Sequence, residues 1–371
     1  MRLLVNILIV LVIAFMLLGA IMVFTASGTY SLSKFNNFYF LFRAHLWKVL
    51  AALILLLVFA YVPYDLYRKY SKKLLFVIIG FLIATLFFAP KVKGAARWID
   101  FGFFQFQPSE AAKVILIMHL AYLIEKQGET LKEFKNGFMF TLIWIGIVSG
   151  LVLIQPNVST SLIIVITSFA ILYVGGARIR HIFAIILPTA GVLGSVIMLF
   201  KHSRERVLTF INSLVTGSDI NIQVTQAKIA LGSGGLTGLG LGHSRQSDLF
   251  LPESYGDFIF SIVGEELGFA GAITVLFLYL SLFVICLIIA KKAQDKFSQL
   301  LVFGLGFNIL LSAFINAGVV TGLLPTTGIT LPFISFGGTS IMIFGLSVGI
   351  ITNIARQTVK TEELKMVVQA K

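Results

Sequence analysis

Charged side chains are scarce in this sequence. Asp, Glu, Lys and Arg make up 12% of its 371 residues, whereas soluble globular domains carry about 25%. Hydrophobic residues make up 58%. So few charges exclude an ordinary soluble globular domain, and the composition predicts a polytopic membrane protein.

Cysteine, metal-ligand and targeting patterns are also nearly absent. The single cysteine, Cys286, lies in an apolar run, so it cannot form an internal disulfide and says nothing about the redox compartment. The five histidines show no ligand spacing and predict no metal site. No cleavage site with a soluble domain follows the first apolar run, which is therefore interpreted as a retained helix. The net charge of +13 comes with no nucleic-acid motif and fits a protein facing anionic lipid.

Long apolar runs are abundant instead. A membrane span needs ~20 mostly apolar residues, which predicts an all-α polytopic membrane protein with ten transmembrane helices in a single domain, residues 1–371. The ten predicted spans are 4–24, 44–62, 74–90, 108–124, 137–154, 158–175, 181–199, 258–290, 299–320 and 333–355. A long external loop, residues 200–257, separates the seventh and eighth helices, and residues 356–371 form the tail.

The loop charges predict the orientation. The flanks on the side of the N-terminus carry most of the 29 lysine and arginine residues, and basic loops stay in the cytoplasm. Both termini and the tail are therefore expected to be cytoplasmic, in a bacterial inner membrane. The opposite side is still basic, chiefly in loop 200–257, which suggests an external anionic partner or contact with membrane lipid.

Loop 200–257 contains a dense glycine tract, residues 232–242. Glycine-rich turns can bind phosphate through backbone N–H groups, but this tract has no Walker lysine and no strand–loop–helix frame. A tightly packed, re-entrant or flexible segment is favoured over phosphate contact. Residues 222–231 are expected to form an amphipathic helix at the membrane interface.

Five motifs occur in an informative order. They are MVFTAS (22–27), GAARWIDFGFFQFQPSEAAK (94–113), GLGLGHS (238–244), LPESYGDFIFSIVGEELG (251–268) and TGITLPFISFGGTS (327–340). On these motifs the chain resembles the SEDS family (shape, elongation, division and sporulation), the FtsW/RodA group. Residues 38–50 and 322–338 look more like the division member, FtsW, than like RodA.

The resemblance implies a peptidoglycan glycosyltransferase that polymerises lipid II into glycan at the outer face of the inner membrane. It also implies a class B penicillin-binding protein as transpeptidase partner, and divisome or elongation-complex proteins around it. One departure concerns Asn157, where the family commonly has Asp. A neutral hydrogen-bonding cap is expected to suffice at that position.

Polymerisation needs a base for the attacking sugar 4-hydroxyl and cations for the departing lipid pyrophosphate. The resemblance makes Asp257 the expected general base in an inverting transfer. From the residues alone, the favoured interpretation of Asp257 is the N-cap of the following helix, and it is the resemblance that reverses this preference. Glu253 is expected to hold a loop arginine or to share a divalent cation (Mg or Mn) with Asp257, or to form a surface ion pair; no cofactor is otherwise implied.

The remaining candidates are charged or aromatic groups expected near the outer face. Glu110 and Lys113 are spaced i, i+3, so they can pair on one helix face, and Lys113 matches a family lysine and is expected to meet pyrophosphate. Arg97, beside Trp98, can bind phosphate through its forked guanidinium, as can Arg204 and Arg206; membrane anchoring is the alternative for each. Glu265 and Glu266 are expected to be structural, as ion-pair or helix-packing partners.

Two other function classes compete with a lipid II polymerase. A lipid II flippase would also need intramembrane charges, but it would place them along a midplane path and often carries internal repeats. The halves of this sequence show no repeat, and the polar candidates gather at one face. A scaffold that only recruits a transpeptidase would need neither Lys113 nor Asp257.

Overall fold

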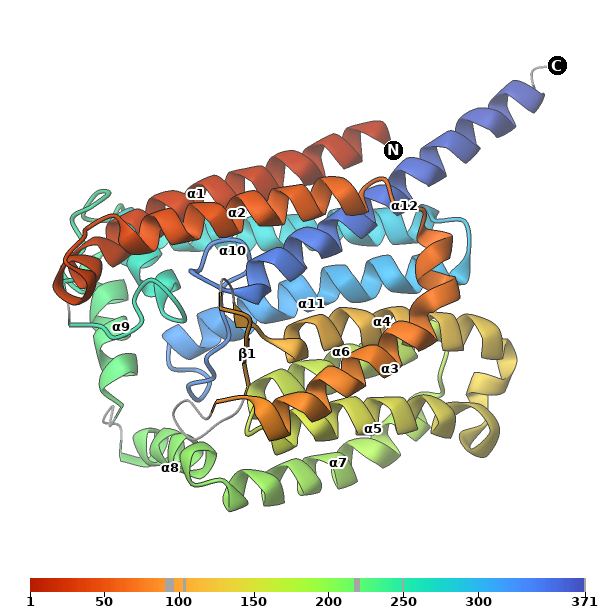
Figure 1. The fold of residues 1–371 in the computed structure, drawn as a ribbon, viewed down its shortest axis with the longest axis horizontal. Helices are drawn as coiled ribbons and strands as arrows, with labels where there is room; N and C mark the ends of the chain where they lie inside the picture. Colours follow the sequence, from red (N-terminus) through yellow and green to blue (C-terminus); the bar gives the residue numbers. More distant parts are fainter. Residues whose placement is uncertain (91–96, 103–104, 217–220, 249, 370–371) are drawn as a thin grey trace.

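The protein folds as a bundle of long helices whose two chain ends lie at the same end of the bundle (Figure 1). The computed structural model describes residues 1–90, 97–102, 105–216, 221–248 and 250–369. The helices are α1 (Arg2–Phe35), α2 (Phe40–Phe59), α3 (Tyr64–Phe88), α4 (Pro108–Gln127), α5 (Met139–Ile154), α6 (Val158–Gly175), α7 (Ile179–Leu199), α8 (Lys201–Thr216), α9 (Ile222–Ser233), α10 (Ile259–Lys292), α11 (Lys296–Val320) and α12 (Thr339–Gln369). Two short turns of helix, Gly128–Lys132 and Phe134–Phe138, precede α5, and strands β1 (Ile99–Asp100) and β2 (Gln105–Phe106) form a small antiparallel hairpin.

The prediction of a mostly helical, polytopic membrane protein is confirmed, but the count of ten spans is not. Nine helices in the described residues are long and apolar enough to cross a membrane. The remaining predicted span, 108–124, forms α4, which carries buried polar side chains such as Glu110, Lys113 and His119. Because α4 packs against α3, α6 and α11, protein and not lipid surrounds these polar groups.

Several helix bounds differ from the apolar runs. Helix α1 continues to Phe35, beyond the predicted end at 24, and α12 begins at Thr339, after the predicted start at 333. Helix α12 then continues through the expected tail to Gln369. The loop predicted to be external, 200–257, contains α8 and α9, and the predicted helix at 222–231 is confirmed as α9, with Ala227 and Ala230 buried.

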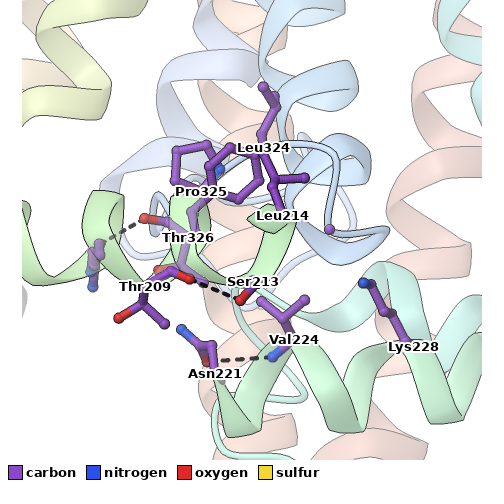
Figure 2. Close-up of a pocket in the computed structure, with 12 residues that line it drawn as sticks. Thr209, Ser213, Leu214, Asn221, Val224, Lys228, Leu324, Pro325 and Thr326 are labelled. Atoms are coloured by element: carbon purple, nitrogen blue, oxygen red, sulfur yellow. Dashed lines mark hydrogen bonds between the residues drawn. The ribbon is translucent and has the colours of Figure 1, made fainter. Parts of the chain in front are cut away.

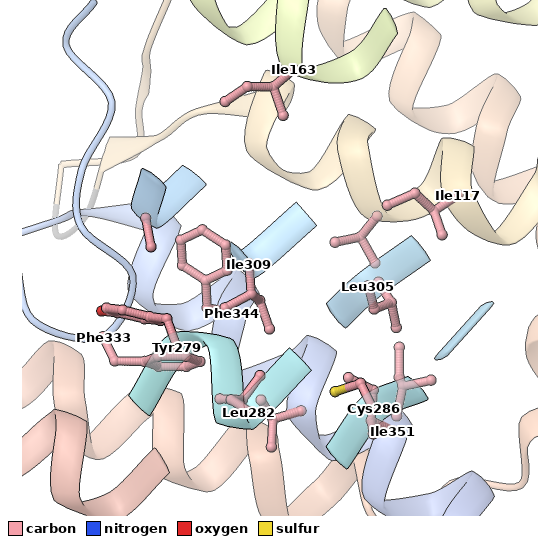
Figure 3. Close-up of a cluster of buried hydrophobic side chains, with 14 of the residues drawn as sticks. Ile117, Ile163, Tyr279, Leu282, Cys286, Leu305, Ile309, Phe333, Phe344 and Ile351 are labelled. Carbon is pink, nitrogen blue, oxygen red and sulfur yellow. The ribbon is translucent and has the colours of Figure 1, made fainter. Parts of the chain in front are cut away.

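The part of the apolar core drawn in Figure 3 combines side chains of α4, α6, α10, α11 and α12, and the same core includes residues of α1. Phe15 stacks on Tyr279 with ring centroids 4.2 Å apart, and both rings are fully buried beside Phe333. The phenol of Tyr279 donates to the Pro332 carbonyl oxygen. This contact fixes the non-helical segment before α12 onto the middle of α10, so the chain around residue 333 is held by tertiary packing. Cys286 lies in the same core as a free thiol.

The glycine tract packs against a break in α10. Gly268, inside α10, has φ 69° and ψ −173°, so the helical hydrogen bonds are interrupted there. The tract supplies replacements: Leu239 N–H donates to the Glu265 carbonyl (2.9 Å), and Phe269 N–H donates to the Gly235 carbonyl (2.9 Å). The close backbone approach explains the glycines, and the preference for a tightly packed segment over a phosphate loop is supported by these contacts.

Glu265 and Glu266 hold the same loop by hydrogen bonds. The Glu265 carboxylate accepts from the Ser244 hydroxyl (2.5 Å) and the Arg245 N–H (3.0 Å), and Glu266 accepts from the Thr25 hydroxyl (3.1 Å). Both carboxylates are buried. The expected structural role is met through hydroxyl and backbone donors, and the ion pairs recorded in the described residues do not include either group.

A polar cluster joins α3, α4 and α11 at the end of the bundle that carries the chain termini. Arg68 Nη2 lies 2.7 Å from Asp295 Oδ1, and its Nε lies 3.3 Å from Glu125 Oε2. Asp295 also caps α11 by accepting from the Ser298 N–H (2.8 Å), and it accepts from the Tyr64 phenol (2.7 Å). Burial raises the pKa of Asp295, but the hydrogen bonds from Ser298 and Tyr64 and the charge of Arg68 lower it more.

Candidate active site

Asp257 lies in the turn immediately before α10. The helix begins at Ile259 and its N-cap position is Phe258, so Asp257 precedes the cap. The N-cap interpretation of Asp257 is therefore wrong. The side-chain amide of Asn316 on α11 donates to the Asp257 carbonyl (2.7 Å) and to the Ile329 carbonyl (2.7 Å). A buried α11 side chain thus fixes the backbone that presents the Asp257 carboxylate.

The residues preceding Asp257 are tied to the segment before α12. Phe336 N–H donates to the Tyr255 carbonyl (2.9 Å), and the Ser335 hydroxyl donates to the Gly256 carbonyl (2.8 Å). The Tyr255 ring packs edge-on against Phe336, with centroids 5.7 Å apart. Burial raises the pKa of Tyr255, and the charge of Glu253 adds to the rise, so this phenol is neutral and acts as a packing and hydrogen-bonding group. Two chain segments therefore form one rigid wall.

This wall borders a cavity of about 1280 Å³. The cavity brings together seven of the eight predicted site residues: Arg97, Trp98, Glu110, Lys113, Arg206, Glu253 and Asp257. They come from the hairpin, α4, α8 and the turn before α10, which lie towards the end of the bundle opposite the chain termini (Figure 1). Small-molecule sites usually measure roughly 300–1,000 Å³, so this cavity can admit a headgroup of several sugar and phosphate units.

Glu110 and Lys113 form the ion pair that their spacing predicts. Lys113 Nζ lies 3.0 Å from Glu110 Oε1, and the side chains are only 4% and 10% exposed. The ammonium also lies 5.6 Å from the centroid of the Phe344 ring on α12. The pair therefore places both a cation and a carboxylate on the cavity wall, in surroundings that contain little water.

Arg97 reaches from the start of the hairpin to the turn between α5 and α6. Its guanidinium donates to the carbonyls of Gln155 (3.4 Å) and Pro156. Asn157 completes this turn as the N-cap of α6, accepting from the Thr160 N–H (3.4 Å), so the expected neutral cap is present. The carbonyl partners fix one side of the Arg97 guanidinium while the residue lines the cavity.

Trp98 packs where the hairpin meets the start of α12. A Cβ on Gly338 would lie 3.3 Å from Trp98 Cζ3, so the indole closely contacts this glycine. Trp98 is half-buried and lines the cavity. Lys91 and Lys93, which extend the basic stretch before it, lie outside the described residues.

The two loop arginines of α8 are in different environments. Arg206 lines the cavity and donates to the Thr326 carbonyl (3.2 Å). Burial lowers the pKa of Arg206, and the negative charge of Asp257, which lines the same cavity, acts in the opposite direction. Burial also lowers the pKa of Arg97, and the charge of Arg206 lowers it further. Arg204 is exposed and is not among the residues that line the cavity.

Nearly the whole chain matches one protein family. The family model for FtsW, RodA and SpoVE, described as "Cell cycle protein", matches residues 5–360. The chain belongs to this family.

Members of the FtsW/RodA/SpoVE family cover the chain almost completely. It is 35% identical over 354 residues to "Probable peptidoglycan glycosyltransferase FtsW" of Geobacter metallireducens, covering 94% of both chains. It is 36% identical over 349 residues to the protein of the same name from Coxiella burnetii, covering 92% of this chain and 93% of that one. The chain is thus a multi-pass inner-membrane protein of the family.

The fold matches a solved structure described as "Structural coordination of polymerization and crosslinking by a peptidoglycan synthase complex". The TM-score is 0.77 at 23% identity, and the match covers 95% of this chain and 97% of that chain. At this identity the likeness shows the fold alone. The shared fold extends over nearly the whole helical bundle of this chain.

A second, smaller pocket of about 70 Å³ adjoins the cavity between α8, α9 and the loop after α11 (Figure 2). Arg206 and Thr326 line both spaces. Lys228 approaches from α9, and a Cβ on Gly322 would overlap its ammonium end. Figure 2 also shows Asn221 capping the start of α9, where its side chain accepts from the Val224 N–H (3.4 Å).

Sequence reasoning missed several residues of the cavity in this FtsW/RodA/SpoVE family member. Lys48 on α2 lines it, although the sequence indicated only that this lysine falls within a span. A charge inside a span is itself a signal of function, and it could have been used for Lys48 as it was for Lys113. Tyr255 and Phe336 carried no charge signal. Among the described residues, no group of three or more His, Cys, Asp or Glu side chains is arranged to hold a metal ion.

Proposed function

We propose that this protein is a peptidoglycan glycosyltransferase that polymerises lipid II, with an FtsW-like role in cell division favoured over a RodA-like role in elongation. The observation that carries the proposal is that the Asp257 carboxylate shares one large cavity with Arg97, Lys113 and Arg206, three of the four cationic side chains that line it. The names of the full-length relatives support the same activity.

The proposed reaction is an inverting displacement. Asp257 takes the proton from the 4-hydroxyl of one lipid-linked sugar as its oxygen attacks the anomeric carbon of the other. The bond to the lipid pyrophosphate breaks, and the leaving group carries away the electron pair. Lys113, Arg97 and Arg206 offset the negative charge of that leaving group. Such fixed charges stabilise it more strongly in a site that is shielded from bulk water. No covalent enzyme intermediate is needed.

The proposed arrangement in the membrane has both chain termini in the cytoplasm and the cavity towards the outer face. The basic flanks on the terminal side support this orientation. A class B penicillin-binding protein is the proposed partner, because polymerised glycan must be crosslinked. The solved peptidoglycan synthase complex is consistent with this pairing, and divisome proteins are the expected wider assembly.

The decisive experiment measures glycan polymerised from labelled lipid II by purified protein, with and without a cognate transpeptidase. Asp257→Asn keeps the size of the side chain but removes the base. Losing a general base costs about 10²–10⁴-fold in rate, so polymer yield should fall by that much while the protein stays folded. Near-normal polymer from Asp257→Asn would remove Asp257 as the base.

The same preparation discriminates the competing functions. If the protein is a flippase, the parent in vesicles would move lipid II between leaflets and would make no polymer. Asp257→Asn would then reduce that movement. A scaffold would neither polymerise nor move lipid II, and its only effect would be to recruit the transpeptidase.

A further inference from the structure

Lys48 is an intramembrane cation that the proposed reaction does not yet use. It lies on α2, about 12 Å along the helix from the first residue, Phe40, at 1.5 Å per residue. This end of α2 is the one opposite the chain termini, because α1 crosses the bundle before it (Figure 1). Lys48 lines the cavity of about 1280 Å³, so its side chain faces the space that holds the candidate active site.

The ammonium of Lys48 is held by an aromatic ring. Its Nζ lies 3.5 Å from the centroid of the Phe336 ring, which is close for a cation–π contact. Phe336 itself is fixed, because its N–H bonds to the Tyr255 carbonyl and its ring packs against Tyr255. The cation therefore lies against the same wall that contains Tyr255 and Gly256, just before Asp257.

Lys48 also has no countercharge in the described part of the chain. The ion pairs there involve Arg68, Lys113 and Lys132 as cations, and none includes Lys48. Charged groups inside a membrane are costly and usually pair with one another or line a functional cavity. Lys113, the other lysine that lines this cavity, has Glu110 as its partner. A ligand that brings its own negative charge would complete the environment of Lys48.

We infer that Lys48 is a substrate-positioning residue that binds an oxyanion of a lipid-linked saccharide, at a place on the cavity wall separate from Lys113. The two lysines come from different helices and lie over different rings, Phe336 and Phe344. Two lipid-linked molecules must meet in this reaction, so two cationic positions suit it. The inference rests on the proposed function for the identity of the ligand, which supplies phosphate and, in its peptide, carboxylate oxygens.

The test is equilibrium binding of fluorescent lipid II to the full-length protein in nanodiscs, without turnover. Losing a charge-assisted contact should weaken binding about tenfold to a hundredfold in Lys48→Met. Lys48→Arg keeps the charge and should bind within a few-fold of the parent. Lys69→Met is the matched control, because Lys69 also lies over a ring, Tyr70 (5.6 Å), but at the opposite end of the bundle; its affinity should be unchanged.

Two further measurements are needed. Thermal stability, compared with Kd, separates substrate binding from a structural role of Lys48, and a second ligand identifies the oxyanion. A purely structural Lys48 would lower the fraction of binding-competent protein and its thermal stability while leaving Kd unchanged, which would overturn the inference. A peptide-free lipid pyrophosphate disaccharide is measured in parallel. Weakening for both ligands identifies phosphate, and weakening for lipid II alone identifies a peptide carboxylate.

The inference and the proposed function can fail separately. Equal Kd values for Lys48→Met and the parent, for both ligands, would refute the role of Lys48 even if the parent polymerises lipid II. A parent that binds lipid II through Lys48 but makes no polymer would refute the proposed reaction and keep the binding site. A parent that binds neither ligand would refute the inference.

Discussion

The ion pair between Glu110 and Lys113 offers the sharpest separation of a structural role from a substrate-binding role. The two side chains are 10% and 4% exposed, with 3.0 Å between Oε1 and Nζ. Removing one partner of such a buried pair leaves an uncompensated charge and costs about 3–5 kcal/mol of stability, whereas replacing both partners with neutral groups is often nearly neutral. Stability should therefore fall in each single variant and recover in the double variant.

Catalysis should respond differently to the same changes. If Lys113 binds pyrophosphate, Lys113→Met loses a charge-assisted contact, worth roughly 1.5–3 kcal/mol, or about ten- to a hundredfold in substrate affinity. The double variant Glu110→Gln/Lys113→Met has the same deficit, because the cation is still missing. We expect its thermal midpoint to approach that of the parent while its KM for lipid II stays raised.

The assay combines thermal unfolding in nanodiscs with initial rates of polymerisation over a range of lipid II concentrations. Glu110→Gln alone completes the cycle, because it keeps the cation and loses only its partner. If the double variant regains both stability and KM, Lys113 serves only the ion pair, and the substrate-binding interpretation is wrong.

Two further changes test the loop arginines and the terminal cluster. Arg206→Ala should raise KM for lipid II about ten- to a hundredfold. Arg204 is at an exposed position of the same helix, so Arg204→Ala should leave the rate of polymerisation within about twofold of the parent. Equal losses in the two variants would contradict the conclusion that Arg206, but not Arg204, lines the cavity. The folded-state pKa of Asp295 is lowered below its ordinary value of about 3.9, so its contribution to stability is present above that pH and is lost as pH falls through the folded pKa. Asp295→Asn should therefore lower the thermal midpoint at pH 7, and the difference from the parent should shrink below about pH 4; a difference that stays constant with pH would refute this.

The sequence was sufficient for features set by local patterns. Apolar runs locate helices because burial in lipid and in the bundle both require them, and the spacing of Glu110 and Lys113 predicts their pairing because i and i+3 share a helix face. The ordered motifs that indicate the family contain Asp257, Lys113 and Arg97, and the structure brings these three residues to one cavity. The number of spans does not follow from local patterns alone, since a helix such as α4 can be polar once protein surrounds it.

Features that depend on distant partners could not be predicted. Gly268 interrupts an apolar run that reads as one continuous helix, and only its backbone pairing with the glycine tract explains the break. The segment at 333–338 is apolar enough to continue a span, but hydrogen bonds to Tyr255 and Gly256 hold it out of the helix. Hydrophobicity does not indicate which way a single lysine in an apolar helix faces, so the orientation of Lys48 towards the cavity could be found only from the structure.

The segment from Gly328 to Phe344 connects the parts of the candidate site. A Cβ on Gly328 would lie 3.3 Å from Asp257 Oδ2, the Phe336 ring lies under Lys48, and the Phe344 ring lies under Lys113. One stretch of chain thus contacts the proposed base and both lysines that line the cavity. Charges at such depth are costly unless their surroundings are fixed.

This arrangement gives a physical reason for a carboxylate, Asp257, at the edge of an apolar helix. Asp257 precedes α10 in a turn whose backbone is bound by Asn316 and whose neighbouring residues are bound by the segment before α12. A base must sit within hydrogen-bond reach of the hydroxyl that it deprotonates, and a flexible loop would not hold it there. The turn supplies an open position beside the cavity, and the two segments supply the rigidity that a helix would otherwise provide.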